Sequence, residues 1–232
     1  MKTRAIVILL ALFIPAVAFG QAFYTQDFEA IAPVDGSMAA DGWFLYTNVF
    51  DAGGGYVGGG GSPAMNNVGN LCDITTGQGG PNQELQQLVV YSNYWDGNHQ
   101  TPGWTIESNL YKEWTVAPGQ GVWTFNFDYK MGDLVNPPSE AFAFIKVLDP
   151  GAGWATVVFN TVETTFAPTT WSSGSITVDL TGREGQIVQI GFLTNSSEYS
   201  ACGVFYDNIA FSHDGTVATE NASFGAVKAL YR

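Results

Sequence analysis

Two carboxylates near opposite ends of the chain have the residue type and surroundings to bind a cation. In the closing apolar segment, strict strand alternation places Asp207 on the same face as Ile209 and Phe211. A carboxylate on an apolar face is costly unless a cation or several hydrogen-bond donors compensate its charge. Glu29 would meet Asp207 if the terminal strands pair, and carboxylate oxygens are ligands that Ca²⁺ prefers. We therefore expect a structural Ca²⁺ at Glu29 and Asp207; the alternative is an Asp207 that caps a turn or accepts backbone hydrogen bonds.

One segment combines aromatic rings with polar side chains, as a glycan site requires. It contains Tyr94, Trp95, Asp96 and His99, and Trp104 follows shortly after. Aromatic faces can stack on sugar rings, and carboxylate or amide groups beside them can bond the sugar hydroxyls. We therefore expect these five residues to bind a carbohydrate. The alternative is that Trp95 folds back and fills one end of the fold.

Catalytic motifs are missing from the sequence. Both G-x-S-x-G and H-E-x-x-H are absent. Glu107 and Glu113 share one face of a predicted strand, and Tyr111 and Lys112 lie beside them. Such a cluster could serve the acid–base chemistry of a lyase, but we favour the interpretation that it is a solvated strand face. We expect a non-catalytic protein.

These candidate residues lie in a chain of short strands and polar turns. Charged residues make up 12% of the sequence and aromatic residues 14%, which is unlike a disordered chain. In residues 122–129, aromatic and polar side chains alternate, which predicts a strand with Trp123, Phe125, Phe127 and Tyr129 in the core; the alternative is that these rings line a concave binding face. About ten such strands and almost no helix predict an all-β fold, a jelly-roll β-sandwich of two antiparallel sheets. The other predicted strands are 22–28, 43–50, 87–91, 104–116, 141–148, 154–162, 175–180, 186–194 and 203–211.

Glycine and proline mark the connections between these strands. The longest connection covers residues 51–70 and includes the glycine-rich run 53–61, where a core strand would have no side chains to pack. We therefore expect this run to be a loop, in which Tyr56 is exposed as a further ligand-binding candidate.

The first residues have the layout of a secretory signal peptide. Lys2 and Arg4 precede an apolar run, and small residues follow it. A membrane anchor is the alternative, but the run is short for a span and no second apolar segment follows. We expect residues 1–21 to be a signal peptide, 22–214 a single sandwich domain and 215–232 a C-terminal tail. The mature chain would then be secreted without a membrane span, and its tail a short helix, a disordered segment or a sorting signal.

The two cysteines are consistent with export. Cys72 and Cys202 both lie beside predicted strands, and disulfides persist outside the cytoplasm. Paired, they would stabilise the fold by about 4–5 kcal/mol in the chain-entropy model. We expect a disulfide between Cys72 and Cys202, with two buried thiols as the alternative. A zinc site is not expected, because the chain has only 2 His.

The charge of the chain argues against one class of partner. It carries 21 acidic and 8 basic residues, for a formal net charge of −13 at pH 7. Such a surface repels phosphate backbones, so we do not expect nucleic acid as a partner. Neutral polymers and divalent cations are compatible with it.

The two ends of the sequence carry a resemblance to a known class of protein. An opening Asp27, Phe28 and Glu29 with a closing segment 205–209 resembles the first and last strands of jelly-roll carbohydrate-binding modules. It is also similar to a set of secreted bacterial proteins of the same shape. The resemblance implies a structural calcium at Glu29 and Asp207 and a polysaccharide as the partner. The alternative is a cell-surface or extracellular-matrix structural or adhesion protein, which the high glycine, threonine and asparagine content also fits.

Overall fold

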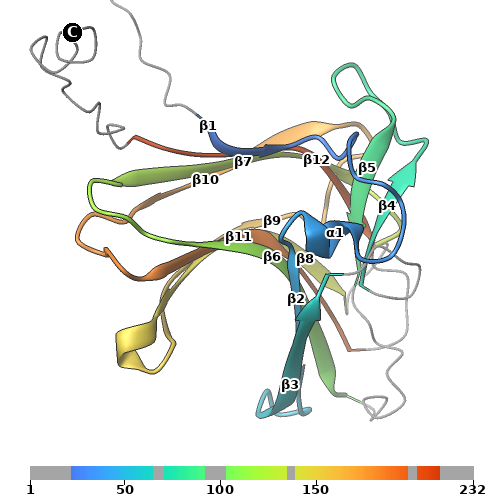
Figure 1. The fold of residues 1–232 in the computed structure, drawn as a ribbon. Coiled ribbons are helices and arrows are strands. Elements are labelled where there is room, and N and C mark those ends of the chain that lie inside the picture. The colour runs from blue at the N-terminus through green and yellow to red at the C-terminus, as the bar shows by residue number, and fades with distance from the viewer. Residues whose placement is uncertain (1–21, 65–70, 92–102, 135–138, 198–202, 215–232) are drawn as a thin grey trace, which may run out of the picture.

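The computed structural model describes residues 22–64, 71–91, 103–134, 139–197 and 203–214. They form two antiparallel sheets packed face to face (Figure 1), which confirms the predicted β-sandwich. Sheet A has the order β10-β7-β12-β5-β4, with β1 also pairing with β12; its strands are β1 (Ala22–Gln26), β4 (Cys72–Thr76), β5 (Gln86–Val90), β7 (Val122–Met131), β10 (Ser172–Asp179) and β12 (Val204–His213). Sheet B has the order β3-β2-β6-β11-β8-β9; its strands are β2 (Phe44–Phe50), β3 (Tyr56–Pro63), β6 (Thr105–Thr115), β8 (Glu140–Asp149), β9 (Ala155–Glu163) and β11 (Ile187–Ser196).

Helical structure in the described residues is limited to two short turns. They are α1 (Ser37–Ala40), which precedes β2, and the 3-10 turn η1 (Pro150–Ala152) between β8 and β9. Neither is long and apolar enough to cross a bilayer.

Every strand predicted from alternation is present, but two strands were not predicted. The expectation of a loop at residues 53–61 is wrong, because β3 runs through these glycines and pairs with β2 along its whole length. The strand is tolerated here since β3 lies at the edge of sheet B and its side chains need not fill the core. Tyr56 at its start is exposed, as expected. The second strand, β4, is an edge strand of sheet A.

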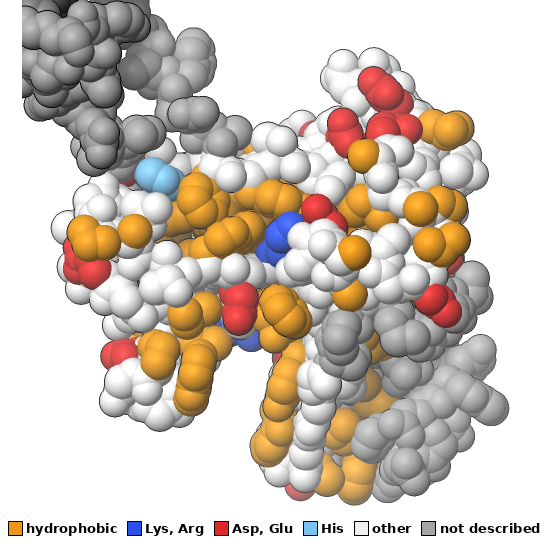
Figure 2. Space-filling view, viewed as in Figure 1, with side chains coloured by type: hydrophobic (Ala, Val, Ile, Leu, Met, Phe, Trp, Pro, Cys, Tyr) orange, Lys and Arg blue, Asp and Glu red, His pale blue; other side chains and the backbone are white. Residues whose placement is uncertain are grey.

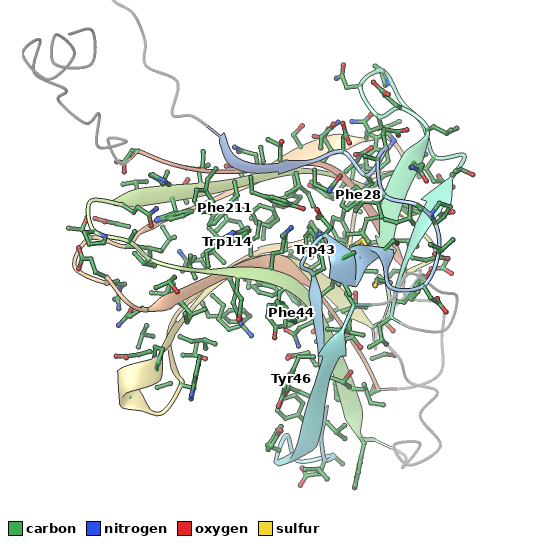
Figure 3. All side chains as sticks on the ribbon, in the orientation of Figure 1. Phe28, Trp43, Phe44, Tyr46, Trp114 and Phe211 are labelled. Carbon is green, nitrogen blue, oxygen red and sulfur yellow. The ribbon has the colours of Figure 1, made fainter. Side chains whose placement is uncertain are left out.

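The core lies between the two sheets and is rich in aromatic rings. Trp123, Phe125 and Phe127 are buried in it, as the alternation predicted. Phe192 of sheet B stacks on Tyr206 of sheet A, with ring centroids 3.7 Å apart. Further cross-sheet contacts lie toward the N-terminal strand, where the rings of Trp114 and Phe211 have centroids 5.2 Å apart (Figure 3).

One half-buried carboxylate ties the N-terminal strand to sheet B. The Oδ2 atom of Asp41 accepts hydrogen bonds from Tyr24 Oη (2.6 Å), Gln26 Nε2 (3.1 Å) and Trp43 Nε1 (3.1 Å). It also forms an ion pair with Lys112 Nζ at 3.1 Å, and the same ammonium donates to the backbone oxygen of Asp41. Burial raises the pKa of Asp41, but the bond from Tyr24 and the bond and charge of Lys112 outweigh it and leave that pKa below its usual value. These contacts hold β1, the α1–β2 connection and β6 together.

The terminal strands pair as expected, but the face of Asp207 differs from the prediction. β1 and β12 are antiparallel neighbours, with Gln26 opposite Ile209. The register of β12 against β7 shifts between Asp207 and Ala210, and Asn208 has a positive φ of 48°. This bulge turns Ile209 toward the core while Asp207 points away from it, so the predicted shared face with Ile209 and Phe211 is wrong. A bulge inserts one residue and so reverses the alternation beyond it.

Candidate functional site

The outer face of sheet B carries four rows of side chains that run across its strands. One row joins Phe44, Tyr111, Gly191, Phe144 and Thr161 through the register of β2, β6, β11, β8 and β9. The next row in one direction holds Glu113, Gln189, Lys146 and Phe159. Two more rows lie in the other direction. The first holds Tyr46, Asn109, Leu193, Phe142 and Glu163, and the second holds Asn48, Glu107, Asn195 and Glu140. We call these residues the sheet B outer face.

The sheet B outer face forms the roof of an open hollow. The β2–β3 hairpin and the β8–η1–β9 hairpin project from opposite edges of the sheet to the same side (Figure 1). The space-filling view shows the molecule hollowed between these two projections, with hydrophobic side chains on the walls (Figure 2). Phe44 and Tyr46 lie on the hollow side of β2 (Figure 3).

The ring of Phe144 occupies the space above Gly191 at the centre of the sheet B outer face. A Cβ atom on Gly191 would fall on the backbone oxygen of Leu110 and within 2.9 Å of Phe144 Cζ, so only glycine fits. Aromatic pairs flank this position. Phe44 stacks on Tyr111 with ring centroids 5.7 Å apart, and Phe144 lies 5.9 Å from the ring of Phe159. Phe144 is itself fully buried, so the rings that this face exposes are those of Phe44, beside Tyr111, and of Phe159.

Carboxylate–amide pairs supply the polar part of the same face. Glu107 Oε1 accepts hydrogen bonds from Asn48 Nδ2 (2.8 Å) and Asn109 Nδ2 (2.9 Å). Two further pairs are Gln189 Nε2 to Glu113 Oε2 (2.8 Å) and Asn195 Nδ2 to Glu140 Oε2 (3.1 Å). Each pair fixes a carboxylate that keeps unused lone pairs, and these can accept hydrogen bonds from hydroxyl groups.

Tyr111 joins the aromatic and polar parts of the face. Burial raises the pKa of Tyr111, and the charge of Glu113 and the neighbouring Tyr46 raise it further. Its hydroxyl therefore stays protonated at neutral pH. It can donate a hydrogen bond beside a ring that also offers an apolar surface.

The predicted glycan residues lie mostly outside the part of the chain that can be described. Tyr94, Trp95, Asp96 and His99 belong to residues 92–102, which the structure does not describe. Trp104 is half-buried and immediately precedes β6.

The predicted acid–base cluster is only partly assembled. Glu107 and Glu113 share the sheet B outer face, as strand parity indicated, and Tyr111 lies on it between them. Lys112 does not join them, because it points into the sandwich toward Asp41. The rings and amides that β2, β8 and β11 bring to the face were not identified from the sequence. A visible signal was the alternation of Phe142, Phe144 and Lys146 with aliphatic residues in β8.

The predicted metal ligands lie near each other at the opposite sheet. Asp207 is 1% exposed; its Oδ1 accepts from Asn208 N at 2.6 Å, whereas its Oδ2 is buried with no hydrogen-bond partner among the described residues. Burial raises the pKa of Asp207 to about 7, and the charges of Asp128, Glu29 and Asp27 add to the rise. An uncompensated carboxylate oxygen near three other carboxylates fits the chemistry of a cation site.

Other atoms near this carboxylate already have partners. Glu29 Oε1 accepts from Leu85 N (2.7 Å) and Gln86 N (2.6 Å), and Gln86 Nε2 donates to the backbone oxygens of Phe28 (3.0 Å) and Glu29 (2.8 Å). Within the described ranges, no three acidic, histidine or cysteine side chains form a group that could hold a metal. A calcium ion beside Asp207 would therefore need backbone oxygens or water to complete its six to eight ligands.

The predicted disulfide is not tested by the described residues. Cys72 is buried at the start of β4, while Cys202 lies in the undescribed range 198–202. β5 pairs with both β4 and β12, so Cys72 and Val204 both lie opposite Val90. The disulfide stays a prediction, and alkylation mass spectrometry with and without reductant would test it.

Comparison with known proteins gives similarity in structure only. No protein-family model matches the chain, and no curated protein matches it in sequence. Similar solved structures are mostly carbohydrate-binding modules with a β-sandwich fold.

Three of these structures illustrate the level of similarity. The CBM22-1 xylan-binding domain of Paenibacillus barcinonensis Xyn10C is 10% identical over 84% of this chain and 95% of that one, with a TM-score of 0.42. The CBM22-1–GH10 modules of Clostridium thermocellum xylanase 10B, complexed with xylohexaose, are 13% identical over 85% of this chain, with a TM-score of 0.45. Bacteriophage CBA120 tailspike protein 4 is 14% identical over 79% of this chain, with a TM-score of 0.43. The chain spans only 29% of the xylanase structure and 21% of the tailspike structure. Similarity at this level does not identify a ligand.

Proposed function

We propose that this protein is a secreted, non-catalytic binding module that holds a polysaccharide against the sheet B outer face. The observation that carries the proposal is the row in which aromatic rings flank Gly191 at the roof of the hollow. Sugar rings have apolar C–H faces and hydroxyl edges. The rings of Tyr111 and the exposed Phe44 would stack on those faces, and the carboxylate–amide pairs would bind the hydroxyls.

Replacing Tyr111 with alanine should weaken polysaccharide binding at least about 10-fold, which corresponds to about 1.4 kcal/mol. The change removes a stacking ring and the hydroxyl donor from the centre of the face. Isothermal titration against soluble xylan, galactan, mannan and mixed-linkage glucan measures the effect.

Phe166→Ala is the matched control for this experiment. Phe166 is 78% exposed in the connection between β9 of sheet B and β10 of sheet A, so its loss should change neither binding nor folding. The proposal fails if the wild-type protein binds none of the polymers, or if Tyr111→Ala binds them as tightly as the wild type does.

We also propose a structural calcium ion that uses Asp207 and Glu29. The support is the buried, unpartnered Asp207 Oδ2 and the convergence of carboxylates around it. The ion would satisfy that oxygen and link the segment after β1 to β12, while the backbone oxygens of Phe28 and Glu29 lie in the same neighbourhood.

Calcium should raise the melting temperature of the protein at neutral pH. At a concentration of about 100 times its dissociation constant, the stabilisation is about 2.7 kcal/mol, or roughly 5–10 °C for a chain of this size. Differential scanning calorimetry in excess calcium and in chelator gives the difference. Asp207→Asn should abolish it, and identical melting of the wild-type protein in both buffers would rule the ion out.

A further inference from the structure

The four basic side chains within the described residues differ in which groups compensate their positive charge. Lys112 pairs with Asp41, Lys130 Nζ donates to Gln78 Oε1 at 3.0 Å, and Arg183 donates to Gln186. Lys146 alone has neither an ion-pair nor a hydrogen-bond partner in the described part of the chain; its contacts are with aromatic rings. An ammonium with no such partner is poorly compensated unless a ligand or water supplies acceptors.

The position of Lys146 places this ammonium within the proposed polysaccharide site. Its Nζ lies 5.2 Å from the ring centroid of Phe144 and 5.7 Å from that of Phe159, and all three residues belong to the sheet B outer face. Burial lowers the pKa of Lys146, and the charge of Glu107 opposes that effect. The ammonium is therefore partly stripped of water while a carboxylate on the same face helps to keep it charged.

The other charges on this face limit what kind of anion it can accept. Glu107, Glu113, Glu140 and Glu163 are all on the sheet B outer face, with Lys146 as its one basic residue. A densely charged polyanion would be repelled by these four carboxylates. A single negative group next to Lys146 would gain a charge-assisted hydrogen bond without meeting the same repulsion along the whole chain.

We infer that the site prefers a mostly neutral polysaccharide with sparse anionic substituents, and that Lys146 binds the anionic group. The group is a carboxylate of a uronic acid branch or a sulfate ester, since either presents oxygens that an ammonium binds. This inference rests on the proposed function and adds a substrate class to it. The exposed ring of Phe159 would place a sugar beside the ammonium.

Paired polymers that differ only in the anionic group provide the test. The first pair is glucuronoxylan and its carboxyl-reduced form. The second is a lightly carboxymethylated cellulose derivative and the same derivative without carboxymethyl groups, and the third is lightly sulfated agarose and unsulfated agarose. Affinity electrophoresis should show at least about 5-fold tighter binding of the anionic member in at least one pair. Added salt should reduce this preference. Polygalacturonate, which is charged at every residue, should bind less well than either member of the pair that shows the preference.

Variants at Lys146 separate its role from folding. Lys146→Met should reduce the preference to less than about 2-fold while binding of the neutral polymer is kept, and Lys146→Arg should retain the preference. Lys130→Met, which removes a lysine from sheet A, should leave it unchanged.

Each remaining outcome overturns a specific statement. Equal binding of both members of every pair, or a preference that survives in Lys146→Met, overturns the inference and leaves the proposed function intact. Absence of binding to every polymer, neutral or anionic, overturns the proposed function together with the inference. Comparison of the carboxylated pairs with the sulfated pair shows whether the site prefers a carboxylate or a sulfate ester.

Discussion

Replacing Asp41 with alanine should lower the free energy of unfolding by about 3–5 kcal/mol, because it leaves the Lys112 ammonium buried without its counter-ion. The change also removes the acceptor of Tyr24 Oη, Gln26 Nε2 and Trp43 Nε1. Each orphaned donor loses its water on folding without regaining a bond. Chemical denaturation of the wild type and the variant in parallel measures the difference.

Two further variants show whether the lost charge partner is the cause. Asp41→Ala combined with Lys112→Met should recover part of the stability, because the uncompensated ammonium is removed as well. Glu84→Ala, at an exposed acidic residue of the β4–β5 connection, should change stability by no more than about 0.5 kcal/mol. A loss below about 1 kcal/mol for Asp41→Ala would contradict the role of the network.

The calcium-free protein should become less stable as the pH rises from about 4 to about 7, and Asp207 should account for as much as about 4 kcal/mol of the loss. The folded-state pKa of Asp207 is raised to about 7, whereas the unfolded chain titrates near the ordinary aspartate value. Between these two pH values the folded state holds a proton that the unfolded state has released. Raising the pH through this window therefore removes stability, and above it the loss is complete.

The comparison with Asp207→Asn isolates this effect from other titrating groups. Urea denaturation at several pH values between 4 and 8, in chelator, should show the variant gaining stability relative to the wild type as the pH rises. Excess calcium should suppress the wild-type loss, because the ion binds the deprotonated carboxylate. A stability difference between the two proteins that is constant over this pH range would contradict the prediction.

Alternation predicted every strand except β3 and β4, but it did not show how far each alternation continues. The segment 203–211 was correctly predicted as a strand, yet Asn208 adopts a positive φ and one residue is added there. Parity counted across such a bulge gives the wrong face, and Asp207 is buried by neighbouring segments rather than by the core. In the glycine run, the failure had another cause, since β3 pairs through its backbone at a sheet edge where no packing is required.

Only the contribution of β6 to the site could be predicted from the sequence. The sequence correctly placed Glu107 and Glu113 on one face of β6. It could not show that β2 and β11 flank this strand or that β8 follows, because strand order depends on contacts between residues far apart in the chain. The alternation of β6 has a further consequence. Tyr111 faces the hollow while its neighbour Lys112 points inward to Asp41, so one strand supports both the proposed binding and the stability of the fold.

Mapping the bound sugar onto the backbone tests the central claim most directly. Amide chemical shifts would be recorded by NMR during titration with a hexasaccharide of the polymer that binds best. We predict that the largest changes fall on β6, β8 and β11, at Tyr111, Phe144 and Gly191 and their neighbours. Changes confined to sheet A, or no changes at saturating sugar, would contradict the assignment of the sheet B outer face as the binding site.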